Sequence, residues 1–484
     1  MNLDDTIVAI ATPAGRGAIG VVRLAGPEAR SISAPMLNLK HDLEPGRAVF
    51  TELIDSITAP EAAPNHVGTA ALGRPTEQSS AALEVAPTPT RIDEVVISYF
   101  AKPHSYTTDD IIEISAHGSP IVLRHIVELA LARGARLAEP GEFTMRAFLN
   151  GRIDLTQAEA VRDLIDSQTL FQAKVAAQQL EGALSRRLQP VKHKLVALIA
   201  RLEAGIDFAE DDVSVPPDAV ILEQIEDVQT PLAELAATSS YGKIVNEGLT
   251  LAIVGRPNVG KSSLFNRLVE RERAIVTATP GTTRDLVSET VAIGGIPVKL
   301  VDTAGIRSAH DEAESIGIRK SLETLADADL VLLVLDATQP LSAEDEELLE
   351  KVATRPSLVV VNKADLRAPS SNARSQPAAN GRVSTSALTG EGIPELRTAI
   401  LRQVSGDTGM QAETALLTNA RHQSLVNQSL GALAAAQDAV ANRIPHEMLL
   451  LDLYNALRPL DEITGATTND DILNLIFSTF CIGK

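Results

Sequence analysis

One stretch of the sequence carries residues typical of phosphate chemistry. Residues 255–263 match the pattern G-x-x-x-x-G-K-S and lie between an apolar run, Leu249–Val254, and a segment with apolar residues at helical spacing, 264–269. In such a strand–loop–helix unit, glycines let backbone N–H groups surround phosphate oxygens, and the helix N-terminus favours negative charge. We therefore expect a P-loop in which Lys261 reaches the β- and γ-phosphates of a nucleotide and the Ser262 hydroxyl binds Mg²⁺.

Three further motifs follow in the order found in GTPases. The threonine-rich stretch 277–285 can supply a second hydroxyl to Mg²⁺ and sense the γ-phosphate. A strand pattern then ends in D-x-x-G, in which Asp302 would hold Mg²⁺ through water and the Gly305 N–H would contact the γ-phosphate. The N-K-x-D motif, 362–365, ends in a carboxylate that can accept from both N1–H and N2–H₂ of guanine, a donor pair that adenine lacks. Ser386–Leu388 stands where a backbone contact to guanine O6 is expected.

Together these motifs predict a GTPase domain built on a doubly wound parallel sheet, with the nucleotide beyond the carboxyl ends of the strands. The expected GTP contacts are Asn258, Val259, Gly260, Lys261, Ser262, Ser263, Thr277, Ala278, Thr279, Pro280, Gly281, Thr282, Thr283, Asp302, Thr303, Ala304, Gly305, Asn362, Lys363, Ala364, Asp365, Ser386, Ala387 and Leu388.

The residue after D-x-x-G is not the glutamine that orients the attacking water in many GTPases. Ile306 stands there and cannot orient water, so we expect an acidic residue downstream to do so. The candidates are Asp311, Glu312 and Glu314, although such a cluster is usually a solvated helix start. No arginine can be assigned as an arginine finger, and Asn258 could instead bind a monovalent cation at that place.

Composition limits the class of protein. The 484 residues predict two to four domains, and the net charge of −20 argues against a broad electrostatic surface for nucleic acid. An RNA partner would then be held by a local patch or by another protein.

Cys481 is the single cysteine, which excludes an intrachain disulfide and fits a reducing compartment. The acidic N-terminus is unlike a signal peptide and the run 330–335 is too short to span a membrane, so we expect a soluble cytoplasmic protein.

The rest of the sequence predicts two more domains. Strand patterns indicate an α+β domain over residues 1–150, interrupted by an Ala-, Pro- and Thr-rich stretch, 56–92, that we expect to be a disordered insertion. Helical spacing dominates residues 151–247 and 406–484, with helices broken near Pro190 and at Pro216-Pro217. We expect these two segments to form one discontinuous all-α domain, into which the α/β P-loop GTPase domain, 248–405, is inserted.

The sequence resembles the tRNA-modification GTPases of the MnmE/TrmE family over nearly its whole length. The stretches that carry the resemblance are Ala11–Gly17, Gly141–Thr144, Arg146–Gly151, Gly255–Asn258, Thr279–Asp285, Asp302–Arg307 and Phe480–Lys484. The resemblance implies an N-terminal α+β domain that binds a formylated tetrahydrofolate and forms a homodimer, a discontinuous helical domain and a Ras-like GTPase domain. It further implies K⁺-stimulated GTP hydrolysis on pairing of two GTPase domains. With an FAD-dependent partner, in a heterotetramer, such proteins add an aminomethyl-type group (carboxymethylaminomethyl or aminomethyl) to C5 of the wobble uridine of certain tRNAs.

The resemblance also implies roles for single residues. The family's water-positioning glutamate corresponds to Glu314, which joins Lys261 and Cys481 as an expected catalytic residue. The implied K⁺ ligands are Asn258, Thr277, Thr279 and Thr282, the Mg²⁺ ligands are Ser262 and Thr283, and the contacts to 5-formyl-tetrahydrofolate are Arg23, Glu113, Arg152 and Lys484.

Two features qualify these implied roles. As a nucleophile, Cys481 would need a base such as His117; otherwise it is a small hydrophobe or an exposed thiol. The sequence departs from the family pattern at Ser119, where a second glycine is usual, and at Arg152, where lysine is common.

Two other functions fit parts of the sequence. A GTPase switch or assembly factor acting on the ribosome would be expected to carry a basic RNA-binding domain, which the acidic composition disfavours. Alternatively, residues 1–150 form a folate-dependent transferase and the GTPase domain regulates it.

Overall fold

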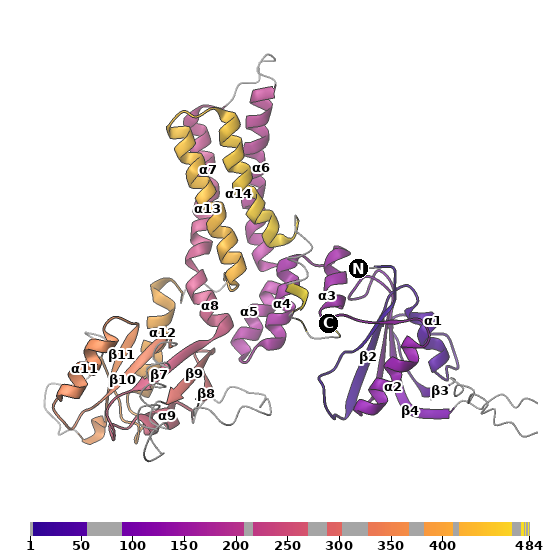
Figure 1. Ribbon diagram of the computed structural model, residues 1–484, viewed down its shortest axis with the longest axis horizontal. Coiled ribbons are helices and arrows are strands. Elements are labelled where there is room, and N and C mark those ends of the chain that lie inside the picture. Colours follow the sequence, from indigo (N-terminus) through magenta and orange to yellow (C-terminus); the bar gives the residue numbers. More distant parts are fainter. Residues whose placement is uncertain are drawn as a thin grey trace, which may run out of the picture. The chain divides into compact units, whose positions relative to one another are not determined.

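The computed structural model (Figure 1) describes residues 3–55, 90–207, 216–269, 288–302, 328–366, 382–409, 416–466, 476–478, 480 and 483. The chain divides into two units, one made of Met1–Asp154 with Thr468–Lys484 and the other of Leu155–Thr467. Most of the insertion predicted over 56–92 lies outside the described residues. Its last three residues were predicted wrongly, because Thr90–Ile92 begin a strand that pairs with residues 53–55.

The first unit is an α+β structure on a six-stranded sheet in the order β3-β4-β5-β2-β1-β6. Its elements are β1 (Ile7–Ile10), β2 (Ile19–Ala25), α1 (Ala29–Ser33), η1 (Ala34–Met36), β3 (Ala48–Asp55), β4 (Thr90–Phe100), β5 (Ile111–His117), α2 (Pro120–Leu131), β6 (Arg136–Leu137) and α3 (Glu142–Leu149). All neighbours are antiparallel except β1 and β6. Alternation places Ile112 and Ile114 in the core with Leu123 and Ile126 of α2. The other face carries a smaller apolar cluster, in which Ile111 packs with Phe143 of α3, and also the polar residues Arg23 and Glu113.

The last residues of the chain pack on this first unit. The Phe477 ring lies 6.5 Å from the Phe148 ring of α3 and 5.5 Å from the Phe480 ring, measured between centroids. The expected helical domain included everything from 406 to 484, whereas these contacts assign 468–484 to the first unit.

Two distant segments of the second unit are helical (Figure 1). They contain α4 (Leu155–Asp166), α5 (Leu170–Leu180), α6 (Ala183–Asp207), α7 (Asp218–Ala237), α8 (Ser239–Glu247), α13 (Ala420–Ala441) and α14 (His446–Thr464). Of these helices, α6, α7, α13 and α14 form a bundle around one apolar core. Leu195 and Ile225, from the segment before the inserted sheet, share a core with Leu433 and Leu453, from the segment after it. This is as predicted for a discontinuous helical domain. The predicted break near Pro190 was wrong, because the exposed proline lies inside α6 and its neighbours Leu188 and Val191 are buried in the bundle.

The sheet between these two segments has the order β12-β11-β10-β7-β9-β8 and is parallel except for the β8–β9 hairpin. Its elements are β7 (Leu249–Val254), α9 (Lys261–Val269), β8 (Ser288–Ile293), β9 (Ile296–Asp302), β10 (Leu330–Asp336), α11 (Ala343–Val352), β11 (Ser357–Asn362), η3 (Ala364–Leu366), β12 (Arg382–Ser384) and α12 (Ile393–Gly409). The central strands β7 and β10 are almost wholly apolar and buried, as parallel strands covered on both faces must be. This confirms the predicted Ras-like α/β fold. In the part of the chain that the structure describes, no helix has the length and apolarity needed to cross a membrane.

A buried charge cluster ties the start of the chain to α3. The fully buried carboxylate of Glu142 lies 2.6 Å from Arg136 Nη2 and 2.9 Å from Arg146 Nη2, and both arginines also bind Asp5. Burial by itself raises the pKa of Glu142, but the hydrogen bonds from Arg136 and Arg146 outweigh it and lower this pKa below 4.5. Because the folded state binds the proton less tightly, the charge stabilises the fold above the ordinary pKa, and this contribution is lost as the pH falls through the lowered value.

We therefore predict that Glu142→Gln destabilises the first unit by about 3 kcal/mol at pH 7, since it removes the charge that faces the fully buried Arg146 guanidinium and the partly exposed Arg136. The opening free energy of α3 amides, measured by hydrogen exchange, tests this. The exposed Glu139 provides the control, and Glu139→Gln should change little. An equal effect of both substitutions, or a Glu142→Gln protein as acid-sensitive as the wild type, would contradict this account.

Candidate functional site

The P-loop connects β7 to α9 and has the geometry of a phosphate cradle. Asn258 (φ 66°) and Gly260 (φ 94°) both adopt left-handed conformations, which turn successive backbone N–H groups toward one side. A Cβ on Gly260 would lie 2.3 Å from the Asn362 amide nitrogen, so only glycine fits there. The Lys261 side chain is 8% exposed and its ammonium donates to the carbonyls of Gly255 (3.0 Å) and Arg256 (2.8 Å), which holds it over the loop.

A buried amide joins the P-loop to the two motifs predicted to read guanine. Asn362 is 1% exposed; its Nδ2 donates to Val259 O (3.0 Å), and its Oδ1 accepts from Ala387 N (3.0 Å). The Asp365 carboxylate accepts from Ser386 Oγ at 2.6 Å. The structure therefore brings together the predicted contacts Asn258–Ser263, Asn362–Asp365 and Ser386–Leu388.

Lys363 follows Asn362 with a left-handed backbone (φ 65°), and its ammonium lies 2.6 Å from Asp336 Oδ2 at the end of β10. Burial works against ionisation of Asp336, but hydrogen bonds from Lys363 and Thr338 lower its pKa to about 2. The Lys363 side chain is thus fixed along the carboxyl edge of the sheet, where the guanine base is expected.

One contact of the P-loop had no counterpart in the sequence analysis. Arg256 Nε donates to Asp345 Oδ1 at 2.8 Å, and Asp345, 2% exposed, also forms a capping box with Ser342 at the start of α11. The pKa of Asp345 is lowered, because hydrogen bonds from Ser342 and Arg256 outweigh its burial. Arg256 is therefore engaged as an anchor of the loop. The S-x-x-D pattern before a helical segment was the signal available in the sequence.

Several predicted nucleotide and ion contacts lie outside the described residues. These are Thr277, Ala278, Thr279, Pro280, Gly281, Thr282, Thr283, Thr303, Ala304, Gly305 and Glu314, while Asp302 is described only as the last residue of β9. Ser262 and Ser263 lie exposed in the first turn of α9, where a hydroxyl can reach a phosphate-bound Mg²⁺. Within the described ranges, no three His, Cys, Asp or Glu side chains are grouped so as to hold a metal ion.

A second polar cluster lies on the sheet face of the first unit that α2 leaves uncovered. Arg23 of β2 and Glu113 of β5 are cross-strand neighbours, and Arg23 Nε donates to the Glu113 carboxylate at 2.8 Å. Arg23 Nη1 also approaches Gly483 O at 3.5 Å. Arg152 Nη1 donates to Tyr106 O at 2.7 Å. Three of the four predicted folate residues are thus close together, while Lys484 lies outside the described residues.

Tyr106 is the part of this cluster that sequence reasoning missed. Its ring contacts two guanidinium groups, with Arg152 Cζ at 5.1 Å and Arg23 Cζ at 5.9 Å from its centroid. Burial raises the pKa of its hydroxyl, which pairs with Thr144 Oγ1 at 3.0 Å. Two guanidinium groups beside one carboxylate and an aromatic ring suit an anionic ligand with a flat ring system.

His117, the predicted base for Cys481, is held by Asp93. Its Nδ1 lies 2.6 Å from Asp93 Oδ1 and its side chain is 73% exposed. Cys481 lies outside the described residues, so this pairing stays a prediction.

Comparison with known proteins covers the whole chain. Residues 155–481 match the family model of the MnmE helical domain, and residues 6–152 match that of the GTP-binding protein TrmE N-terminus. Over 489 residues the chain is 64% identical to the tRNA modification GTPase MnmE of Koribacter versatilis, covering 100% of both. It is 41% identical to the protein of that name from Aquifex aeolicus, covering 99% of this chain and 100% of that one.

Solved structures match a smaller part. The crystal structure of Era with MgGDPNP and a fragment of 16S ribosomal RNA is 29% identical, covers 38% of this chain and 66% of that chain, and has a TM-score of 0.27. At this score the likeness adds nothing to the fold described above. The two family models and the full-length relatives agree with one another, and the chain belongs to the MnmE/TrmE family of tRNA modification GTPases.

Proposed function

We propose that this protein is a GTPase that acts in tRNA modification. The observation that carries the proposal is the Asn362 amide, which links the P-loop at Val259 to the guanine-reading loop at Ala387. Family membership supports the tRNA substrate, since its relatives carry the name tRNA modification GTPase. The finer proposal is that, with an FAD-dependent partner, the protein adds an aminomethyl-type group to C5 of the wobble uridine in the cytoplasm.

In the proposed reaction, Asp365 accepts from the guanine N1–H and N2–H₂, and its Ser386 hydrogen bond holds it in place. Lys261 exchanges the carbonyls of Gly255 and Arg256 for phosphate oxygens. Mg²⁺ on Ser262 and Thr283 would offset charge on the phosphates when bound. We further propose that Glu314 orients the attacking water. The proposed K⁺ ligands are Asn258, Thr277, Thr279 and Thr282.

The proposed division of labour follows the sequence. Residues 248–405 would form the GTPase domain, and residues 1–150 would bind 5-formyl-tetrahydrofolate through Arg23, Glu113 and Arg152, with Lys484 from the chain end. The described charges support this site, because Arg23 and Arg152 offer donors to carboxylates of such a ligand.

We also propose a homodimer through the open sheet face of the first unit. Cross-strand register places Phe50, Val96 and Ile19 on the same face as Arg23, and with Phe100 they are 36% or more exposed. An apolar patch of this kind on a sheet is typical of an interface between copies. A second copy there would also cover the Arg23–Glu113 pair.

Asp365→Asn should weaken GDP binding by about 100-fold, because an amide cannot accept from both guanine donors. Titration with a fluorescent guanine nucleotide measures this, and the exposed Glu391→Gln serves as the control. Unchanged affinity in Asp365→Asn would remove the carboxylate from base recognition.

Calorimetry with 5-formyl-tetrahydrofolate and the full chain tests the folate site. Arg23→Ala should weaken binding by about 10- to 100-fold through loss of a charged hydrogen bond, and removal of Lys484 should also weaken it. The exposed Arg47→Ala should bind like the wild type. No binding to the intact chain would refute the folate site and favour a GTPase switch acting on the ribosome.

Phe50→Glu should shift the full chain from dimer to monomer in light scattering, since it places a charge in the apolar face. Glu44→Lys, at an exposed position of the same unit, is the control. A wild-type chain that is monomeric at all concentrations would contradict the proposed dimer.

A further inference from the structure

Helix α5 touches the nucleotide-binding sheet at the β8–β9 hairpin. Its N-cap residue Thr169 donates from Oγ1 to Gly295 O at 2.5 Å. Gly294 and Gly295 form the two-residue turn of the hairpin, with φ of 59° and 84°, as tight hairpins require. Phe171 packs on this turn so closely that a Cβ on Gly295 would lie 2.6 Å from the Phe171 Cβ. The contact therefore fixes the turn from outside the sheet.

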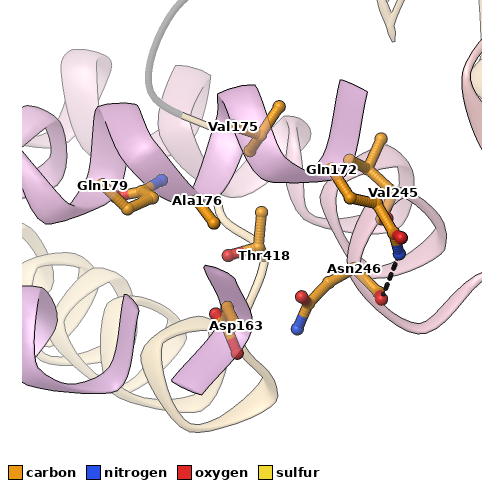
Figure 2. Close-up of a pocket in the computed structure, with 8 residues that line it drawn as sticks. All are labelled: Asp163, Gln172, Val175, Ala176, Gln179, Val245, Asn246 and Thr418. Atoms are coloured by element: carbon orange, nitrogen blue, oxygen red, sulfur yellow. Dashed lines mark hydrogen bonds between the residues drawn. The ribbon is translucent and has the colours of Figure 1, made fainter. Parts of the chain in front are cut away.

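The first turn of α5 also holds the end of α8, the helix that leads into β7. Gln172 is 8% exposed, and its Nε2 donates to Val245 O (2.9 Å) and Asn246 O (2.8 Å) at the end of α8, the second of which Figure 2 marks. Its Oε1 accepts from the backbone N–H groups of Gln168 and Thr169. All four hydrogen-bonding positions of this amide are thus satisfied, so the side chain has one defined place.

These two contacts lie at the base of two strands that end in the nucleotide site. β7 begins at Leu249, just after α8, and leads to the P-loop, while β9 begins at Ile296, just after the hairpin turn, and ends at Asp302. The two strands pair in parallel, with Leu249 opposite Val298. At about 3.3 Å per residue, each strand is about 20 Å long. A shift of α5 at the start of these strands would therefore displace the phosphate-binding loops at their other end.

An apolar cluster and a small pocket lie where α5 meets α8 and the hairpin turn. Val245, Ile296 and Leu416 are buried together, with Phe171 and Val175 of α5 packed against them. Beside Gln172, the pocket in Figure 2 is lined by polar groups that include Asp163, Asn246 and Thr418. Burial raises the pKa of Asp163, which lines this pocket, to about 6.

We propose that Thr169 and Gln172 are positioning residues for GTP hydrolysis, which set β9 and its terminal Asp302 relative to the P-loop from the helical part of the chain. The inference rests on the proposed GTPase function and adds to it a control point outside every nucleotide-binding motif. Because bound GDP relies on the P-loop and N-K-x-D, a misplaced β9 should affect turnover more than GDP binding.

Gln179 provides a matched comparison on the same helix. It is 7% exposed, and its Nε2 donates to Leu416 O (2.7 Å), on the segment that leaves the nucleotide-binding part, and not to α8 or the hairpin turn. In the full chain, Gln172→Met should lower kcat for GTP about tenfold, with GDP affinity and KM within about twofold, as a small misplacement of reacting groups does. Gln179→Met should lose thermal stability and keep kcat within about twofold of the wild type.

A second pair of variants separates the hairpin contact from helix capping. Thr169→Asp can still accept from the Gln172 N–H as an N-cap, but it cannot donate to Gly295 O. Thr169→Ser keeps both hydrogen bonds. We expect Thr169→Asp to lower kcat and Thr169→Ser to match the wild type.

Equal kcat in Gln172→Met and Gln179→Met, or in Thr169→Asp and Thr169→Ser, would overturn the inference. A wild-type chain that does not hydrolyse GTP would instead refute the proposed function. Hydrogen exchange of residues 288–302 without nucleotide distinguishes the two failures, because Gln172→Met and not Gln179→Met should speed exchange there whatever the catalytic activity.

Discussion

The Asn362 side chain must satisfy its hydrogen bonds inside the protein, because it is only 1% exposed. Its partners, Val259 and Ala387, follow β7 and β12, which are not neighbours, since β10 and β11 lie between them. The amide at the end of β11 therefore connects loops across the carboxyl ends of four strands and sets the distance between the phosphate loop and the base-reading loop. An apolar residue there would leave a carbonyl and an N–H unpaired in the interior, which costs more than the bonds contribute. Gly260 is tied to the same constraint, because any side chain would overlap this amide.

The motifs that could be predicted are local in the chain. A P-loop or an N-K-x-D stretch carries its ligand groups within a few consecutive residues, so strand and helix patterns on either side were enough to place Lys261 and Asp365. Tyr106 could not be found this way, because its role depends on Arg23 and Arg152, which are distant in the sequence, both lying close to its ring. The same is true of Asp345, which reaches Arg256 only after α11 packs beside the P-loop. The helix break predicted near Pro190 was wrong because a local signal was given too much weight. Packing of Leu188 and Val191 in the bundle outweighs the hydrogen bond that a proline removes.

The stretch from Gly141 to Gly151 shows that a family motif need not mark a ligand site. Glu142 and Arg146 helped to identify the family, yet both side chains are fully buried and bind each other, Arg136 and Asp5. Their work is to join α3 to the first residues of the chain. Arg152, just beyond the motif, is the residue that reaches the second polar cluster. Structure and ligand recognition are thus encoded side by side in one stretch of sequence.

The packing of Phe477 and Phe480 on α3 has a consequence for biosynthesis. The first unit combines residues 1–154, which are translated before the second unit, with residues 468–484, which are translated after it. Its sheet can form while the helices and the nucleotide-binding sheet are still being translated, but the contacts of Arg23 with Gly483 and of Phe148 with Phe477 must wait until the whole second unit has been made. A chain cut between the second unit and Phe477 therefore carries a first unit that lacks these contacts.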